Sequence, residues 1–253
     1  MPVEENREGE DLATPLPWTA KGELAGVVLY GELLSPPSAK IRALLCFYGV
    51  PFAVGPQHKP GSTYRKRPIL DIGVGAAARQ VNDSAIIFKN VAPILCGAPL
   101  DERTRRMDAH FTNDFMLALE AEAFGEGTEA ELGRFILQDF WITSPCVWWV
   151  VSKLAGMRIL RGIAKGVRRK HPALRPATAY LSEFKAGFAD GAAFWHGDAP
   201  GPLDIATFGL VFAFVEPDVR VVRDAIAAAG LVQWYAAVRA AFAPADLRRM
   251  FPA

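Results

Sequence analysis

The chain has 253 residues, more than one average domain needs, so two domains are expected. Its 28 basic and 27 acidic residues nearly cancel, so no strong overall field draws it to nucleic acid or to anionic substrates. Cys46, Cys96 and Cys146 are widely spaced and form neither a disulfide framework nor a zinc-binding pattern. We therefore expect a cytoplasmic protein without a metal site.

The first 24 residues are acidic and lack an apolar run, so they do not form a secretory signal. We expect residues 1–24 to be a disordered, solvated tail. The most apolar stretch, 140–151, is interrupted by Pro145 and is shorter than the roughly 20 apolar residues that cross a bilayer. The sequence therefore predicts no transmembrane helix.

The next segment alternates short β-rich runs with helical patterns. Ser35 suits a helix N-cap and Pro36 the first helical position, while Asp83 suits the cap of a second helix. The predicted elements are strands at 27–30, 52–54, 68–72 and 79–81, with helices beginning after Ser35 and over 85–95. Their order is β-α-β followed by β-β-α, and it predicts a first domain over 25–98.

Beyond Pro99 the hydrophobic spacing is helical almost throughout, and Gly or Pro residues separate the segments. The predicted helices are roughly 101–124, 129–143, 146–170, 174–194, 202–215, 218–229 and 231–242. The sequence therefore predicts a second, all-helical domain over 99–253.

Several of these segments resemble the glutathione transferase superfamily, and most closely its membrane-associated prostaglandin E synthase type 2 branch. The matching stretches are YRKRPIL at 64–70, QVNDSAI at 80–86, PLDIATFG at 202–209 and QWY at 233–235. This resemblance implies a thioredoxin-like N-terminal domain followed by an all-helical C-terminal domain. It also implies glutathione as co-substrate, a small apolar second substrate and a homodimer.

The resemblance assigns site residues one by one. A cis bond before Pro68 would let the Arg67 backbone pair with the cysteinyl part of glutathione as an added strand. Asp83 and Ser84, at a helix N-terminus, match the residues that hold the γ-glutamyl end, and Ser38 belongs to the same site. The alternatives are an ordinary trans proline at the start of a strand and a helix cap without a ligand.

Ser35 stands where the superfamily has either a redox cysteine or a catalytic serine. Its hydroxyl could donate a hydrogen bond to the glutathione thiolate and lower the pKa of that thiol, or it could simply cap the helix. Because Ser35 and Ser38 replace the two cysteines of the synthase branch, thiol transfer and prostaglandin isomerase activity are disfavoured. Tyr30 is a weaker catalytic candidate, since strand alternation would more often bury it.

The link over 55–63 is shorter than the helical segment that relatives carry there. Gln57, His58 and Lys59 are candidates for holding the glycyl carboxylate of glutathione, and the alternative is that His58 and Lys59 are exposed loop residues. Gly201 replaces the usual Ser or Thr cap before Asp204, which can still accept backbone N–H groups.

Two features of the helical domain carry further hypotheses. The basic amphipathic stretch 153–170 suggests weak contact with an anionic membrane surface, and the alternative is a solvated basic face above a core-facing stripe. On the first helix of this domain, one set of side chains either lines an acceptor pocket or packs in the core: Met107, His110, Phe111, Asp114 and Phe115.

Two functions remain open from the sequence. One is an enzyme that binds glutathione in the N-terminal domain and an apolar electrophile between the domains, with Ser35 as the catalytic residue. The other is a non-catalytic binding or scaffold protein with the same fold, peripheral to a membrane. A capping hydroxyl and a catalytic hydroxyl have the same sequence signature, so the chain itself does not decide between them.

Overall fold

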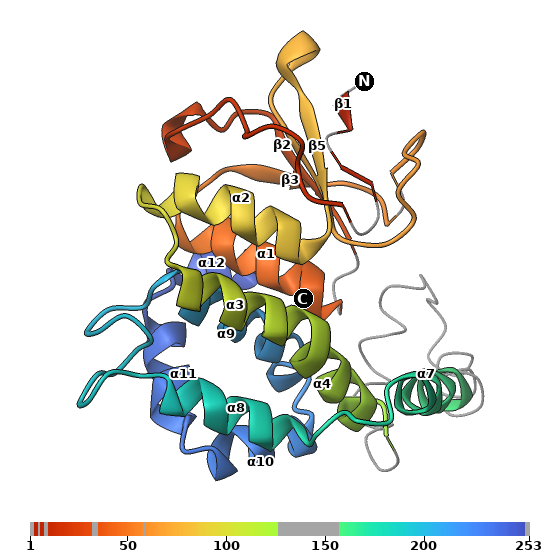
Figure 1. Cartoon of the computed structure of the whole chain (residues 1–253), viewed down its shortest axis with the longest axis vertical. Coiled ribbons are helices and arrows are strands. Elements are labelled where there is room, and N and C mark those ends of the chain that lie inside the picture. Colours follow the sequence, from red (N-terminus) through yellow and green to blue (C-terminus); the bar gives the residue numbers. More distant parts are fainter. Residues whose placement is uncertain are drawn as a thin grey trace.

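A computed structural model describes residues 3–4, 6–7, 10–31, 35–57, 59–125 and 157–250. Its first part is a five-stranded sheet with two helices on one face (Figure 1). The elements are β1 (Val3–Glu4), η1 (Lys21–Glu23), β2 (Val27–Tyr30), α1 (Pro36–Phe47), β3 (Phe52–Val54), β4 (Ile69–Ile72), η2 (Gly75–Ala77), β5 (Arg79–Asn82) and α2 (Ser84–Cys96).

The strand order is β1-β5-β4-β2-β3. Strand β2 pairs parallel with β3 and antiparallel with β4, and β4 pairs antiparallel with β5. This arrangement confirms the predicted β-α-β, β-β-α order and fits a thioredoxin-like domain.

The N-terminal segment, expected to be a disordered tail, contributes Val3, Glu4 and Asn6 to the sheet. Val3 and Glu4 form strand β1, which pairs parallel with β5. Asn6 is buried. Its side-chain amide donates to the carbonyl of Asn82 at 3.1 Å, and its side-chain oxygen accepts the N–H of Asn82 at 2.9 Å. The Asn82 side-chain amide in turn donates to the Asn6 carbonyl at 2.7 Å. The sequence did not predict this contact, because the segment is acidic and one buried amide with two strand residues adds almost no hydrophobic pattern to it.

Period-two alternation divides the sheet into two unlike faces. Leu29, Leu70, Ile72 and Val81 are almost fully buried and point toward α1 and α2. On the opposite face, Asp71 of β4 and Gln80 and Asn82 of β5 carry polar side chains, and the connection over 55–68 covers that side. Helices α1 and α2 lie between the sheet and the rest of the molecule (Figure 1).

From residue 101 to 250, every regular element of the described chain is a helix, apart from an isolated bridge between Phe194 and Gly197. The elements are α3 (Glu102–His110), the π-helical segment η3 (Phe111–Phe115), α4 (Met116–Ala123), α7 (Met157–Lys170), α8 (Ala177–Ala186), α9 (Pro202–Val215), α10 (Arg220–Ala228), α11 (Val232–Ala240) and α12 (Pro244–Met250). The predicted mixed domain followed by an all-helical domain is therefore confirmed as a fold class.

Individual helix predictions differ in their outcome. The predicted helix over 129–143 and the first part of 146–170 lie outside the described residues. Helix α8 ends at Ala186, earlier than the predicted 194, because the Trp195 ring packs directly against Gly187 and Arg103 donates a hydrogen bond to the Gly187 carbonyl. Helix α12 was not predicted.

No single helix in the described chain has both the length and the apolar character needed to cross a membrane. Helices α10 and α11 reach that length and apolar character only when they are taken together, and the chain bends by 109° between them.

Helix α9 joins the two parts of the molecule. It is apolar on all sides, and every residue from Pro202 to Phe214 is buried. A Cβ atom added at Gly209 would lie 2.7 Å from the Cα of Lys40 and 2.9 Å from the Cβ of Ala43. The absence of a side chain at Gly209 therefore allows α9 and α1 to cross at very short range.

Asp204, in the first turn of α9, fixes the start of this helix. Its buried carboxylate accepts hydrogen bonds from the N–H of Gly201 at 3.0 Å, the N–H of Trp195 at 3.1 Å and the indole N–H of Trp234 at 2.9 Å. The capping role predicted for Asp204 is present despite the glycine at 201. Burial raises the pKa of Asp204, and these three donors oppose that change.

A buried ion pair also links the two parts of the molecule. Lys40 of α1 has no exposed side-chain surface, and its ammonium lies 2.6 Å from the carboxylate of Asp108 on α3 and 2.7 Å from the hydroxyl of Thr112 in η3. Burial lowers the pKa of Lys40 and raises that of Asp108, and the attraction between the two groups opposes both changes.

We predict that Lys40→Met lowers the free energy of unfolding by about 3–5 kcal/mol, because it leaves the Asp108 carboxylate buried without its cation. Denaturant titration measures the loss. Arg105→Met is the control, since its ion pair with Glu102 is exposed and contributes about 1 kcal/mol or less. A double variant, Lys40→Met with Asp108→Leu, should recover most of the loss. Equal effects of Lys40→Met and Arg105→Met would contradict this account.

Candidate functional site

The predicted site residues converge at one edge of the sheet because of the strand register. Tyr30 at the end of β2 pairs with Ile69 at the start of β4, and Ile69 pairs with Asn82 at the end of β5. The residues that follow or precede these positions therefore lie along the same edge. They are Gly31, Pro68 and Asp83, and the N–H of Asp83 donates to the carbonyl of Pro68 at 3.2 Å.

Both helices of the first domain begin near this edge. Helix α1 starts after Ser35 and α2 starts after Asp83, each following a strand that ends there. Helix N-termini present free N–H groups and a partial positive charge, which favours an anionic ligand. Pro36 and Pro37 remove two of these donors from α1, so α2 offers the better anion-binding end.

Asp83 has a backbone conformation that few side chains adopt. Its φ of 73° lies in the left-handed region, and holding a residue other than glycine there costs about 1–3 kcal/mol. One carboxylate oxygen, Oδ1, accepts the N–H of Ala85 at 2.8 Å and caps α2, whereas Oδ2 has no hydrogen bond to the described residues. Ser84, the first residue of the helix, is buried. The cap is thus present, and it uses only one of the two carboxylate oxygens of Asp83.

Ser35 occupies the N-cap position of α1 without acting as a side-chain cap. Its carbonyl accepts the N–H of Ala39 at 2.8 Å, but its hydroxyl makes no capping hydrogen bond. Ser38 is fully buried, and its hydroxyl has no partner among the described residues. A Cβ atom at Gly31 would collide with this hydroxyl, so the first turn of α1 packs closely on the end of β2.

The cis bond predicted between Arg67 and Pro68 is present. Pro68 is buried, and Arg67 is half-buried with its pKa lowered by burial.

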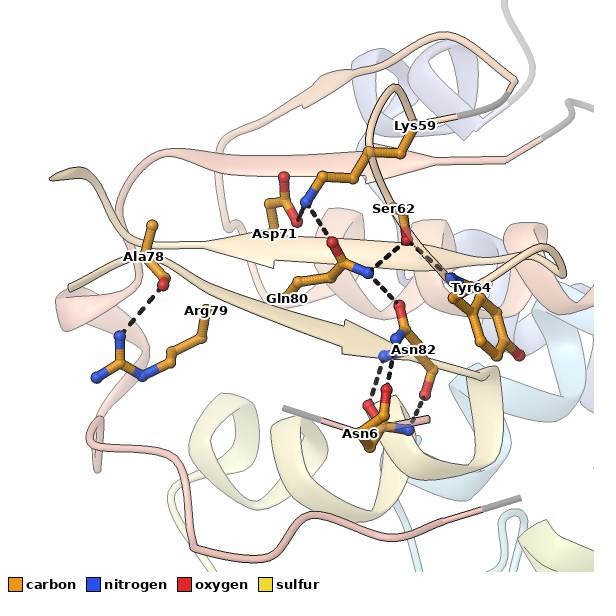
Figure 2. Close-up of polar contacts among 9 residues, drawn as sticks. All are labelled: Asn6, Lys59, Ser62, Tyr64, Asp71, Ala78, Arg79, Gln80 and Asn82. Atoms are coloured by element: carbon orange, nitrogen blue, oxygen red, sulfur yellow. Dashed lines mark hydrogen bonds and ion pairs between the residues drawn. The ribbon is translucent and has the colours of Figure 1, made fainter. Parts of the chain in front are cut away.

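Lys59 has neither of the two roles considered from the sequence, a ligand of the glycyl carboxylate or an exposed loop residue. Its side chain is 8% exposed, and its ammonium lies 2.5 Å from Asp71 of β4 and 2.6 Å from the amide oxygen of Gln80 on β5 (Figure 2). Its charge is therefore neutralised inside the first domain, and we exclude Lys59 as the group that holds a glycyl carboxylate. Gln57 is exposed, and His58 lies outside the described residues.

The polar face of the sheet continues from Lys59 as a connected network (Figure 2). Gln80 donates to the hydroxyl of Ser62 at 2.8 Å and to the amide oxygen of Asn82 at 2.9 Å, and Ser62 also accepts the N–H of Tyr64 at 3.1 Å. This network fastens the 55–68 connection to the sheet, and the described residues of that connection form no helix.

Two further side chains considered from the sequence take no part in the edge site. Tyr30 faces the Lys59 network, and burial together with the nearby Asp71 carboxylate raises the pKa of its phenol. Cys46 of α1 is buried, and burial raises its thiol pKa to about 12, so it stays protonated. The described residues also contain no group of His, Cys, Asp or Glu side chains that could hold a metal ion.

The predicted acceptor-pocket residues of α3 and η3 divide into two groups. Phe111 and Phe115 pack in the core against Phe184 and Tyr180. Three others lie at the surface of the helical part. Met107 and His110 line a hollow of about 470 Å³ between α3 and α8, and Asp114 binds the His110 ring at 2.8 Å.

The Lys40 cluster beside the site was missed by sequence reasoning. Asp83 lies close enough to act electrostatically on both Lys40 and Asp108. Thr112 reaches Lys40 from a π-helical segment, a rare geometry that is frequent at functional sites. A lysine on an amphipathic helix is ordinarily exposed, so no sequence signal marks this one.

Solved structures with the same arrangement identify the fold. A glutathione S-transferase III solved in its apo form superposes with a TM-score of 0.56 at 16% identity, over 90% of this chain and 97% of that one. The chain has the glutathione transferase fold. No protein-family model matches the sequence, and no curated protein matches it.

Two further structures have this fold. A glutathione transferase from Burkholderia graminis, solved with two glutathione molecules per subunit, gives a TM-score of 0.53 at 15% identity, over 89% of this chain and 87% of that one. FzlA from C. crescentus gives 0.50 at 14% identity, over 90% and 93%. At these identities the comparison establishes the glutathione transferase fold alone.

We predict that Lys59→Met loosens the 55–68 connection, because the buried Asp71 carboxylate loses its cation and Gln80 loses a donor. Hydrogen–deuterium exchange should become faster in residues 59–66 and in β4. Gln57→Met, an exposed change in the same loop, serves as the control and should leave the exchange unaltered. Unchanged protection in Lys59→Met would mean that the network does not hold the loop.

Proposed function

We propose that the protein is a glutathione transferase-like enzyme that binds glutathione at the sheet edge formed by Arg67, Pro68, Asp83 and Ser84. The observation that carries the proposal is the register of β2, β4 and β5, which brings these residues and the start of α1 to one edge. The glutathione transferase of similar fold from Burkholderia graminis was solved with glutathione bound, which supports the choice of ligand.

Each end of the ligand has a matching group. The Oδ2 of Asp83, which has no hydrogen bond to the described residues, can accept the α-ammonium of the γ-glutamyl residue, and the N–H groups at the start of α2 can bind its carboxylate. Ser35, with a hydroxyl that is not engaged in capping, is the group proposed to donate to the thiolate. Ser38 lies in the same turn of α1, and its buried hydroxyl has no partner among the described residues. An apolar electrophile would then enter from the side of the helical domain.

We predict that Asp83→Ala weakens glutathione binding by about 1–3 kcal/mol, since it removes a charged hydrogen-bond partner. Isothermal titration calorimetry measures the affinity. Asp101→Ala is the matched control, because Asp101 caps α3 in the same way through the N–H of Thr104 at 2.6 Å. Both changes remove a helix cap, but only Asp83→Ala should weaken binding. Unchanged affinity in the folded Asp83→Ala variant would refute the site.

We also predict that Ser35→Ala slows conjugation of glutathione to a small electrophile by about ten-fold or more, because the thiolate loses its donor. The absorbance of the bound thiolate, followed against pH, should show a raised thiol pKa in this variant, which loss of a helix cap alone would not produce. Wild-type protein should give no thiol transfer, and conjugation unaffected by Ser35→Ala would reduce this serine to a structural role.

A second function, binding without turnover, is favoured by two specific observations. Pro36 and Pro37 remove backbone donors near the proposed thiolate, and Lys59 is committed to Asp71 and Gln80. Glutathione that binds but is not conjugated would support this second function.

Three finer features remain proposals from the sequence: a homodimer, a cytoplasmic location and a place in the prostaglandin E synthase type 2 branch. Weak contact of α7 with a membrane surface also remains a proposal, because Leu160 and Ala164 are buried in the molecule whereas Ile163 of the same helix is 42% exposed.

A further inference from the structure

Asn6 binds the main chain of the residue that precedes Asp83. Its side-chain oxygen accepts the N–H of Asn82 at 2.9 Å, and its side-chain amide donates to the carbonyl of Asn82 at 3.1 Å (Figure 2). Both asparagines are buried. One side chain from the N-terminal segment therefore holds both backbone groups of the last residue of β5.

These contacts fix the peptide plane that leads into Asp83. The carbonyl of Asn82 and the N–H of Asp83 belong to the same planar peptide unit. The carbonyl accepts a hydrogen bond from Asn6, and the N–H donates to the carbonyl of Pro68 at 3.2 Å. Both polar groups of this plane are therefore held, one by the N-terminal segment and the other by the residue at the start of β4.

The fixed plane matters because the backbone of Asp83 is strained. A residue other than glycine keeps a φ of 73° only where the surrounding structure enforces it. With this φ, the Oδ1 of Asp83 lies 2.8 Å from the N–H of Ala85 and caps α2. A peptide plane free to rotate would let Asp83 relax to a negative φ, and its carboxylate would then turn away from the start of α2.

The segment that carries Asn6 also contacts α2 at a second place. Asp11 forms an exposed ion pair with Lys89, and its other oxygen accepts a hydrogen bond from Asn90 at 3.4 Å. These contacts lie more than one helical turn beyond Asp83. An exposed ion pair stabilises little, so Asn6 is the buried anchor of the segment and the contact closest to the site.

We propose that Asn6 is a positioning residue of the proposed glutathione site. By holding the peptide plane before Asp83, it keeps the Asp83 carboxylate in the orientation that caps α2 and accepts the α-ammonium of the γ-glutamyl residue. This role rests on the proposed function and adds to it a residue that acts through Asp83 without touching the ligand. If Asn6 only fastened the N-terminal segment to the sheet, its loss would have no effect specific to Asp83.

Amide exchange of the full chain, followed by nuclear magnetic resonance, tests the positioning without a ligand. Asn6→Ala should make the amides of Asp83 and Ala85 exchange about five-fold faster or more, because the hydrogen bonds of both amides depend on the fixed plane. Asp11→Ala is the matched control from the same segment and should change neither rate. The N–H of Thr104, capped in the same way at the start of α3, should be unchanged in both variants and shows that the fold is intact.

Calorimetric titration with glutathione tests the consequence for the site. Asn6→Ala should weaken glutathione binding by about five-fold or more, whereas Asp11→Ala should leave the affinity within about two-fold of the wild type. In an Asp83→Ala background, Asn6→Ala should change the affinity by less than about two-fold, because Asn6 acts through Asp83. A general loss of stability would instead lower the affinity equally with and without Asp83.

Three results would overturn the role of Asn6: unchanged exchange in Asn6→Ala, equal effects of Asn6→Ala and Asp11→Ala, or additive effects of Asn6→Ala and Asp83→Ala on affinity. A wild-type protein that does not bind glutathione would overturn the proposed function and with it the part of Asn6 in binding. The exchange comparison needs no glutathione, so it decides separately whether Asn6 holds Asp83.

Discussion

The contact between α1 and α9 is the constraint on which the rest of the molecule depends. Gly209 lets the backbone of α9 approach that of α1, and Lys40 reaches from the same part of α1 to Asp108 and Thr112. The backbone contact fixes how closely α1 approaches α9. The buried charge fixes the position of α1 against α3 and η3, because a displaced Lys40 would lose both partners without gaining water. Helix α1 thereby fastens the sheet to the helical domain.

This attachment bears directly on the proposed glutathione site. The start of α1 carries Ser35, and Lys40 lies a little more than one turn further along the same helix. A shift of α1 against α3 would move the serine relative to Asp83, whose position is set by the β4–β5 ladder. The geometry of the proposed site thus depends on neighbouring contacts that are not themselves assigned to the ligand.

The two faces of the sheet are covered through different kinds of interaction. Toward the helices, apolar side chains are buried, whereas on the other face Lys59, Asp71 and Gln80 form a closed set of ionic and hydrogen bonds. A short connection without a helix has too little apolar surface to cover a sheet. A satisfied polar network can hold it instead, since each buried group has its partner.

The sequence by itself determined the order of strands and helices over 27–96, the start of α1 after Ser35 and of α2 after Asp83, and the helical character of the second domain, because each depends on local spacing and on neighbouring residues. Tertiary structure decided the rest. Whether Lys59 is a ligand group or an internal cation, whether Lys40 is exposed and whether Asn6 belongs to a tail or to the sheet depend on partners distant in the chain. Hydrophobic periodicity carries no information about such polar pairs, since a charged side chain has the same local signature whether water or a buried partner satisfies it.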